Sequence, residues 1–215
     1  MTGSGLVTSM LDKYNVAPVD TAIATRMVVE NHYLHRKGPC SRAFGLYDAA
    51  RSLKGVVTYG VPASVPLVKG LLGPENRNLV GELTRLWVAD DVPKNGESFL
   101  IGRTVRQSGF EVLVSFADTS MGHVGVVYQA TNWLYTGLSA SHKDWVLIGN
   151  EGRHTRHTWD EWGGIEGAKR AIPERMMQVE RPRKHRYVFI NAKGTRRKKL
   201  LSQLRYPVLP YPKGV

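Results

Sequence analysis

The chain has 215 residues, 42% of them hydrophobic, and it carries a formal net charge of +12 at pH 7. This length and composition favour one globular domain with an ordinary buried core. No apolar run approaches the roughly 18 residues of a transmembrane helix, and the first residues lack the pattern of a signal peptide. Because Cys40 is the only cysteine, these features exclude membrane-spanning and disulfide-stabilised classes, and we expect a cytoplasmic protein.

The positive charge is concentrated towards the C-terminus. Residues 1–150 hold 14 Lys and Arg against 12 Asp and Glu, whereas residues 151–215 hold 16 against 6. Such an asymmetry indicates a polyanionic partner, either nucleic acid or an anionic membrane surface. We predict a core of residues 1–150 with a basic extension of residues 151–215 packed on it.

The first predicted elements are a helix and a hairpin. Residues 21–32 place apolar side chains on one helical face, and Asp20 is suited to cap that helix. Residues 43–47 and 55–59 are predicted as the two strands of a hairpin. Three prolines in residues 61–78 predict an irregular surface loop.

A strand–helix–strand unit follows. We predict strands over residues 82–88 and 112–116, with a helix over residues 97–107 between them. Asp118 follows the second strand at its carboxyl end, where open α/β sheets bind ligands. Further strands are expected at 133–137, 145–148 and 185–190, a short helix start at 158–162, and a basic helix at 195–204 before a proline-rich tail.

The turn before the helix at 97–107 is a candidate phosphate-binding loop. A strand that leads through a glycine-containing turn into a helix presents unpaired N–H groups, which suit a pyrophosphate. An ordinary strand-to-helix turn explains the local pattern equally well. The candidate cofactor-binding residues are Trp87, Lys94, Asn95, Gly96 and Ser98.

Glu82 and Arg85 lie on the first strand of this unit. Residues three apart on a regular strand point to opposite faces, so both can face a ligand only if a bulge is present. Arg85 is suited to pair with a phosphate or the substrate backbone, and it is equally suited to be a buried partner of Glu82.

Cations near the C-terminus form the candidate DNA-binding surface. Trp159, Trp162 and Tyr187 are interleaved with them, a mixture that suits phosphate contacts with stacking on an exposed base. A purely solvated basic face is the alternative. The cations are Arg181, Arg183, Lys184, Arg186, Arg196, Arg197, Lys198 and Lys199.

Several segments together resemble one known family, the phage Mom family of DNA modification proteins with a GNAT-like acyltransferase fold. The resemblance implies a GNAT-like α/β fold, a mixed central sheet flanked by helices. It also implies an enzyme of the host bacterial cytoplasm that converts adenine in double-stranded DNA to an N6-carbamoylmethyl-type derivative, protecting phage DNA from restriction. The segments are Asn31-His-Tyr-Leu-His35, Gly55-Val-Val-Thr-Tyr-Gly60, Glu82-Leu-Thr-Arg-Leu-Trp-Val88, Ser115-Phe-Ala-Asp118, Gly122-His-Val-Gly-Val-Val-Tyr-Gln-Ala-Thr-Asn-Trp133 and Tyr135-Thr-Gly137.

The resemblance further implies a cofactor and catalytic roles. GNAT-like enzymes use acetyl-CoA or a related acyl-CoA, and Tyr128 would be the acid that protonates the departing thiolate. Asp118 and Arg85 complete the implied catalytic set. Pro93 stands where the GNAT phosphate loop has Gln or Arg, a departure from the pattern. Without the resemblance, Tyr128 would be an aromatic residue on a buried helix face.

An iron site is implied as well. In the Mom family a His-Tyr pair and an Asp are associated with bound iron, and the matching residues are His32, Tyr33 and Asp118. Imidazole, phenolate and carboxylate are suitable iron ligands, but sequence spacing alone does not bring His32 and Asp118 together.

Two other classes of function stay open. An ordinary GNAT N-acetyltransferase of a small amine or a protein would use the cofactor loop and Tyr128 but has no need of the C-terminal charge. A non-catalytic nucleic-acid-binding protein would use the charge but not Tyr128 or Asp118.

Overall fold

The computed structural model describes residues 10–149 and 159–213, which form two compact units. The sheet unit comprises Met1–Ala117, Val124–Gly137 and His185–Val215, and the hairpin unit comprises Asp118–His123 and Leu138–Lys184. The chain therefore does not divide at residue 150 as predicted, because the segment from His185 onwards belongs to the sheet unit. No helix in the described ranges is long and apolar enough to cross a membrane.

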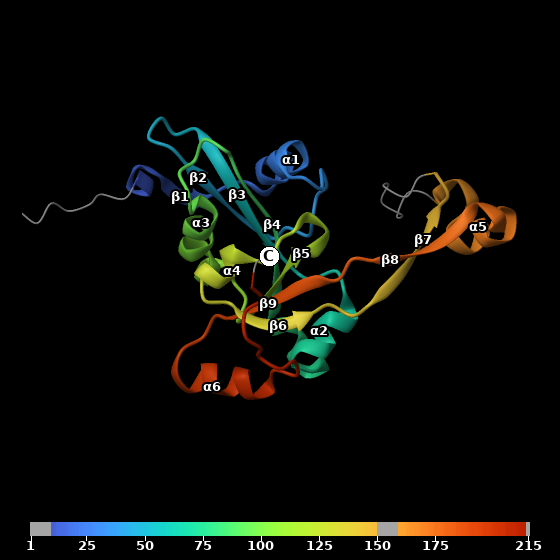
Figure 1. Ribbon diagram of the computed structural model, residues 1–215. Helices are drawn as coiled ribbons and strands as arrows, with labels where there is room; N and C mark the ends of the chain where they lie inside the picture. The colour runs from blue at the N-terminus through green and yellow to red at the C-terminus, as the bar shows by residue number, and fades with distance from the viewer. Residues whose placement is uncertain (1–9, 150–158, 214–215) are drawn as a thin grey trace, which may run out of the picture. The chain divides into compact units, whose positions relative to one another are not determined.

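The sheet unit is built on seven strands in the order β1-β2-β3-β4-β5-β9-β6 (Figure 1). Strands β1 to β4 pair antiparallel, whereas β4 and β5 pair parallel. The sheet is thus mixed, as predicted. The strands are β1 (Asn15–Pro18), β2 (Arg42–Tyr47), β3 (Leu53–Gly60), β4 (Val80–Val88), β5 (Val112–Asp118), β6 (Leu134–Leu138) and β9 (Lys184–Ile190).

Helices cover both faces of this sheet (Figure 1). On one face, Val28 of α1 packs in a cluster with Val56 of β3. On the opposite face, Leu100 of α3 packs in a cluster with Val57, because successive residues of a strand point to opposite sides. The helices are α1 (Thr21–Asn31), α2 (Val65–Leu72), α3 (Gly96–Thr104), α4 (Val126–Ala130) and α6 (Gly194–Gln203).

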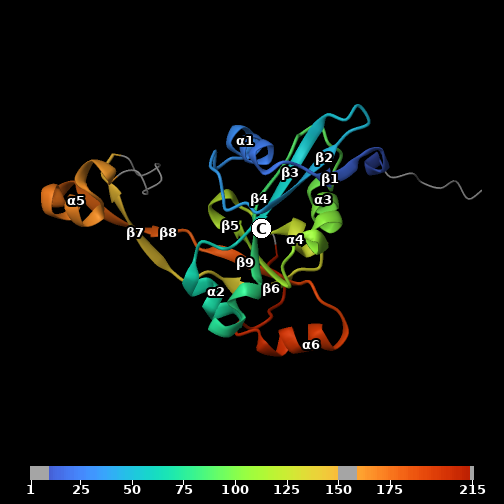
Figure 2. The ribbon, with the colours of Figure 1, turned by 180° about the vertical axis from the view of Figure 1, so that it is seen from behind.

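Helix α2 occupies part of the segment 61–78 that was predicted to be irregular. Ser64 caps it by accepting the N–H of Leu67, and Pro66 sits in the first turn, where a missing N–H costs no helical hydrogen bond. Its apolar face packs in a cluster with Leu200 of α6 (Figure 2). The loop prediction was wrong because a proline also suits the start of a helix.

The C-terminal residues complete the sheet instead of forming a basic extension. Strand β9 lies between β5 and β6, and α6 covers its buried residues. The tail then returns along β6, where the Leu209 N–H donates to the Tyr135 carbonyl at 2.9 Å. The Tyr211 hydroxyl donates to the Trp133 carbonyl at 2.8 Å. This tail therefore contacts the turn that follows α4.

The hairpin unit is an antiparallel strand pair with a short helix. β7 (His142–Leu147) pairs with β8 (Met176–Arg181), and α5 is Ile165–Ala171. Trp159 is only 5% exposed, and Trp162 packs against the same cluster. The prediction that both tryptophans stack on bases is therefore corrected for Trp159, which is a core residue, whereas Trp162 is partly buried against this core. Of the predicted helix start, Asp160–Trp162 is a 3-10 turn and residue 158 lies outside the described ranges. The buried core residues are Leu147, Trp159, Ala168 and Met176.

Candidate functional site

The candidate site lies where β4 and β5 part. Their parallel pairing joins residues 80–82 with residues 112–114 and then ends, while β4 continues to Val88 and β5 to Asp118. The predicted strand–helix–strand unit is confirmed, since α3 connects these two strands.

Tyr128 of α4 meets Ser115 of β5 at this place. Their hydroxyl oxygens are 2.8 Å apart, and Ser115 Oγ is 2.9 Å from the Leu83 carbonyl oxygen of β4. Because Ser115 has a single hydroxyl proton, its oxygen accepts the Tyr128 proton whenever it donates to Leu83. The three groups form a hydrogen-bonded chain from α4 through β5 to β4. Sequence reasoning gave Ser115 no role, although a polar residue in the apolar run 112–116 was an available signal.

Burial controls the chemistry of Tyr128. Burial raises its pKa to about 12, and the hydrogen bond with Ser115 lowers the pKa only in part. The residue is 7% exposed, and its ring lies 5.3 Å from Trp133 and 5.2 Å from Tyr187 between centroids. The hydroxyl therefore stays protonated at neutral pH and can donate a hydrogen bond. The buried-aromatic alternative also describes its packing correctly.

A bulge in β4 places Glu82 and Arg85 on the same face. The register against β3 shifts between Thr58 and Tyr59, which leaves Thr84 as the additional residue on β4. Side-chain alternation changes at such a bulge, so Glu82 and Arg85 both face the side on which α1 packs. The charge of Glu82 raises the pKa of Arg85 and of Tyr128. Glu82 therefore belongs to this site, although the sequence analysis assigned it no catalytic role.

Arg85 uses its donors on backbone carbonyls. Nε donates to Arg36 at 3.0 Å, Nη1 to Thr84 at 2.6 Å and Nη2 to Lys37 at 3.4 Å. Burial lowers the pKa of Arg85, and Glu82 offsets this in part. This geometry lets Arg85 hold the segment after α1, and its contact with phosphate or substrate stays a prediction.

The His32–Tyr33 pair lies at the end of α1. The two rings stack with centroids 4.3 Å apart and planes at 27°. His32 is buried, and its Nδ1 accepts the N–H of Leu34 at 3.1 Å. An accepting Nδ1 places the proton of the neutral ring on Nε2. Tyr33 is 42% exposed.

Asp118 ends β5 and belongs to the hairpin unit. Its Oδ2 forms an ion pair with Lys184 Nζ at 2.6 Å, and its Oδ1 accepts the Ser120 N–H at 3.1 Å and the Ser120 hydroxyl at 2.6 Å. Burial raises the pKa of Asp118, but the contacts from Lys184 and Ser120 outweigh it and hold the pKa below its ordinary value. Asp118 is therefore a charged ion-pair partner in this arrangement.

These contacts do not fit the predicted iron site. The tautomer that lets His32 accept from Leu34 puts a proton on Nε2, where a metal would need a lone pair. Both oxygens of Asp118 are engaged by Lys184 and Ser120. Across residues 10–149 and 159–213, no three His, Cys, Asp or Glu side chains gather to hold a metal ion. Iron is not supported, and no step of the reaction is assigned to it.

The start of α3 lies beside a cavity of about 460 Å³. Asn95 and Ser98 line it together with Arg106 and with residues 130–132 at the end of α4. Asn95 has a left-handed φ of 74°, a conformation that Asn tolerates better than most residues. The structure thus brings two of the predicted cofactor-binding residues to one cavity.

The other three predicted cofactor-binding residues have different surroundings. Gly96 is buried, and a Cβ there would collide with Val92, so the glycine serves the close packing of the turn. Lys94 is exposed. Trp87 packs in the cluster of α1, on the face of the sheet opposite to α3. Trp87 is therefore not brought to the cavity.

Arg186 and Tyr187 are core residues, which corrects their predicted place on an exposed basic surface. Arg186 is 6% exposed, its Nη2 donates to the Thr136 carbonyl at 2.7 Å, and its guanidinium lies 3.5 Å from the ring centroid of Tyr206. Tyr187 is fully buried beside Tyr128. Arg186 therefore binds the neighbouring strand β6, and Tyr187 packs against Tyr128 in the core.

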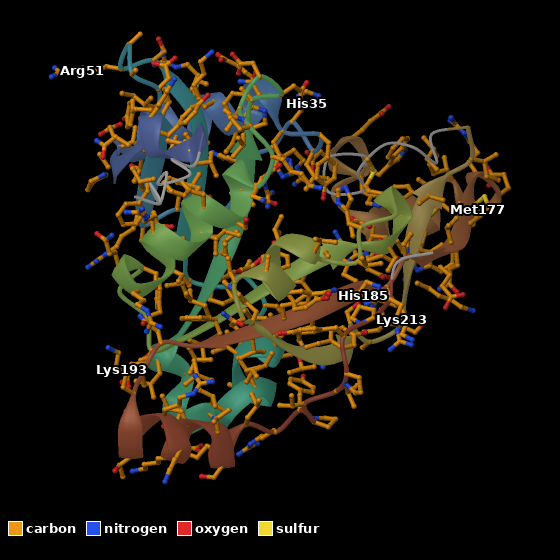
Figure 3. All side chains as sticks on the ribbon, turned by 60° about the vertical axis from the view of Figure 1, so that its left-hand side comes forward. His35, Arg51, Met177, His185, Lys193 and Lys213 are labelled. Atoms are coloured by element: carbon orange, nitrogen blue, oxygen red, sulfur yellow. The ribbon has the colours of Figure 1, made fainter. Side chains whose placement is uncertain are left out.

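The remaining predicted cations divide between the units. In the hairpin unit, Arg181 pairs with Asp144 at 2.6 Å, and Arg183 Nε donates to the Ser139 carbonyl at 2.6 Å. The cations of the α6 segment lie in the sheet unit, and Figure 3 shows Lys193 where this helix begins. Arg196 pairs with Glu111 at 2.6 Å, Arg197 donates to the Ile190 carbonyl at 3.0 Å, and Lys193, Lys198 and Lys199 are exposed.

Comparison with known proteins gives two kinds of result. The sequence model of the Mom protein family matches residues 13–213. "Methylcarbamoylase mom" of Escherichia phage Mu is 33% identical over 207 residues, which cover 91% of this chain and 78% of that protein.

The structural comparisons are weaker. Spermidine/spermine N-acetyltransferase SpeG of Vibrio cholerae has a TM-score of 0.47 at 10% identity, covering 85% of this chain and 95% of that one. The putative acetyltransferase yncA of Salmonella typhimurium, solved with acetyl-CoA, has 0.47 at 10%, covering 85% and 96%. Because these scores are low, the fold description depends on the sheet order itself.

Proposed function

Because the chain belongs to the Mom protein family, we propose that it is a phage transferase that converts adenine in DNA to an N6-carbamoylmethyl-type derivative and so protects phage DNA from host restriction. The match to "Methylcarbamoylase mom" over 91% of this chain carries the proposal. The hydrogen-bonded hydroxyls of Tyr128 and Ser115 support the proposal that the transfer takes place where β4 and β5 part.

Double-stranded DNA in the host cell is the proposed substrate. An adenine stacked in a duplex does not reach a site bounded by buried side chains, so the base has to leave the stack. Phosphate contacts would hold the duplex meanwhile. The exposed cations Lys193, Lys198 and Lys199 are suited to these contacts, whereas Arg181 and Lys184 are engaged by carboxylates.

The proposed transfer replaces one proton on the adenine N6 with the new carbon substituent. The N–C bond forms while the bond from that carbon to its leaving group breaks, and the leaving group keeps the bonding electrons. A Tyr128 with a pKa of about 12 is a weaker acid than a thiol with a pKa of about 8.5. Tyr128 would therefore stabilise charge on the leaving atom by hydrogen bonding, with Ser115 directing its hydroxyl.

N6 attack on the acyl carbon of an acyl-CoA would release the thiolate and one N6 proton and give an N6-acyl group, whereas a carbamoylmethyl product bonds N6 to a CH2 carbon, which needs a leaving group of its own. Asn95, Ser98 and Arg106 would hold an acyl-CoA, since they line a cavity of about 460 Å³, a size within the range of small-molecule sites. The amide nitrogen of a carbamoylmethyl product is not part of an acetyl group. A separate nitrogen donor is therefore required.

Mass spectrometry of nucleosides from plasmid DNA tests this proposal. The plasmid is co-expressed with the protein, and the expected result is a modified deoxyadenosine that is absent from cells with an empty vector. Unmodified nucleosides together with acetylation of an amine would identify an ordinary N-acetyltransferase instead. Unmodified nucleosides from cells that contain folded, DNA-binding protein would identify a binding protein without this activity.

A further inference from the structure

Helix α4, which carries Tyr128, is too short to hold its own position. It comprises only Val126–Ala130 and begins after Gly125, whose φ of 81° is left-handed. A helix of about one turn makes too few hydrogen bonds to be stable by itself. The place of the Tyr128 hydroxyl beside Ser115 therefore depends on the segments that hold α4 and the turn after it.

Strand β9 holds the beginning of α4 from the core. The ring of Tyr187 packs against that of Tyr128, with 5.2 Å between centroids. The Tyr187 hydroxyl donates to the Val124 carbonyl and accepts from Gln129 Nε2 at 3.0 Å. A Cβ at Gly125 would collide with the Tyr187 ring, so the chain enters α4 in direct contact with β9.

The C-terminal tail, residues 206–212, holds the other end of this segment. The tail runs from α6 to α4 (Figure 1), and it pairs with β6 on the way. The Tyr211 hydroxyl donates to the Trp133 carbonyl at 2.8 Å, and the Trp133 N–H donates to the Tyr128 carbonyl at 3.0 Å. Two consecutive hydrogen bonds within the sheet unit thus connect the tail to the backbone of Tyr128.

The same turn forms one side of the cavity beside α3. Residues 130–132 line that cavity, and they lie in the chain between Tyr128 and Trp133. By holding Trp133, the tail fixes both the residue proposed to act on the leaving group and a side of the cavity proposed for the acyl donor. Tyr211 is 44% exposed, so this contact opens more readily than contacts of the core.

We propose that Tyr211 is a positioning residue for the transfer. Its hydroxyl holds the turn of residues 128–133, so that the Tyr128 hydroxyl keeps its place beside Ser115. This inference rests on the proposed function, because it assumes that Tyr128 acts on the leaving group. Tyr211 acts through the backbone of Trp133 and needs no contact with substrate.

A double-mutant cycle tests this role through the rate of adenine modification on a co-expressed plasmid. Tyr211→Phe keeps the ring but removes the hydroxyl, and it should lower the rate about fivefold at matched protein levels, the order of one neutral hydrogen bond. Its affinity for duplex DNA should stay unchanged. In the Tyr128→Phe background the same substitution should change the rate by less than about twofold, because the hydroxyl that it positions is already absent.

Tyr206→Phe is the matched control, because Tyr206 lies in the same tail and its ring, against which Arg186 stacks, is retained. It should leave the rate unchanged in both backgrounds. Equal losses from Tyr211→Phe in the two backgrounds would overturn the proposal, since Tyr211 would then act through another part of the chain. A loss in Tyr206→Phe as large as that in Tyr211→Phe would overturn it as well, by assigning the effect to the tail as a whole.

Hydrogen exchange of backbone amides separates this inference from the proposed function, since it requires no activity. The N–H groups of Asn132 and Trp133 donate to the carbonyls of Gln129 and Tyr128. Tyr211→Phe should raise the exchange of these two amides about fivefold and leave the amides of β3 unchanged.

The exchange result decides each combination with activity. Unchanged exchange at Asn132 and Trp133 would overturn the positioning role even if modification slows. Raised exchange in a protein whose wild type leaves plasmid DNA unmodified would support the hold of Tyr211 on the turn and reject the proposed function.

Discussion

Two neighbouring stretches of the C-terminal third carry similar numbers of cations but differ in their charge. Residues 138–184, mainly the hairpin unit, hold nine Lys and Arg with seven Asp and Glu, whereas residues 185–215 of the sheet unit hold eight with none. Within the hairpin unit, Arg181 and Lys184 are paired with carboxylates. The comparison teaches that the basic character belongs to the α6 segment, which is part of the same unit as the proposed reaction site.

Tyr128→Phe is expected to have the largest effect, because it tests whether the reaction takes place in the sheet unit. The change keeps the ring and its packing but removes the hydroxyl that meets Ser115. Loss of this group should slow DNA modification by about a hundredfold or more, measured as modified adenine per unit time. Because the pKa of Tyr128 is about 12, the wild-type rate should show no loss from its ionisation below about pH 11.

Tyr47→Phe serves as the control, since Tyr47 is a partly buried tyrosine on β2. A folded Tyr128→Phe protein that modifies DNA at the wild-type rate would remove Tyr128 from the reaction. If the variant loses its cooperative melting, the hydroxyl is a structural hydrogen bond instead.

Matched triple substitutions compare the two basic stretches directly. Replacing Lys193, Lys198 and Lys199 by Ala should reduce the slope of log affinity against log salt for duplex DNA by about 2 to 3, since each lost phosphate contact contributes about 0.9. Replacing Lys143, Arg170 and Arg175, which are exposed in the hairpin unit, should change it by less than about 1. Equal changes in the two triples would contradict the comparison.

The ion pair of Asp118 and Lys184 predicts the smallest effect, on pH-dependent stability. The pKa of Asp118 is lowered on folding, so its stabilisation is present above the unfolded pKa of about 3.9 and is lost as pH falls through the folded value. Lys184→Met should remove the part of this contribution that comes from Lys184, while the Ser120 contacts remain, and lower stability at pH 7 by roughly 1–3 kcal/mol, measured by urea unfolding. A variant with the acid sensitivity of the wild type would assign the effect to other carboxylates.

Local signals predicted much of this fold. The capping residue Asp20 and the apolar face behind it placed α1, and the order of strand, turn and helix placed β4, α3 and β5. The sequence analysis stated that Arg85 and Glu82 can face one side only if β4 contains a bulge. The position of this bulge depends on the pairing of β4 with β3. Such pairing is not encoded in the spacing of β4 alone.

The site was harder to predict because its contacts are distant in the chain. Arg186 has the sequence context of a surface cation. Its guanidinium nevertheless donates to the carbonyl of Thr136, which is distant in the chain on β6, and lies over the ring of Tyr206. Asp118 has the context of a ligand at a strand end, yet Lys184, the first residue of β9, neutralises it. Side chains of this kind become core or surface only through partners that composition does not reveal.

The central position of β9 makes assembly of the sheet depend on the end of the chain. β5 ends at Asp118 and β6 begins at Leu134, but the strand that joins them in the sheet begins only at Lys184. During synthesis these two strands therefore wait for a neighbour that the ribosome makes after both strands of the hairpin unit. Such long-range pairing slows folding and leaves apolar strand edges exposed in the interval. The seven-stranded sheet is thus complete only after β9 has been translated.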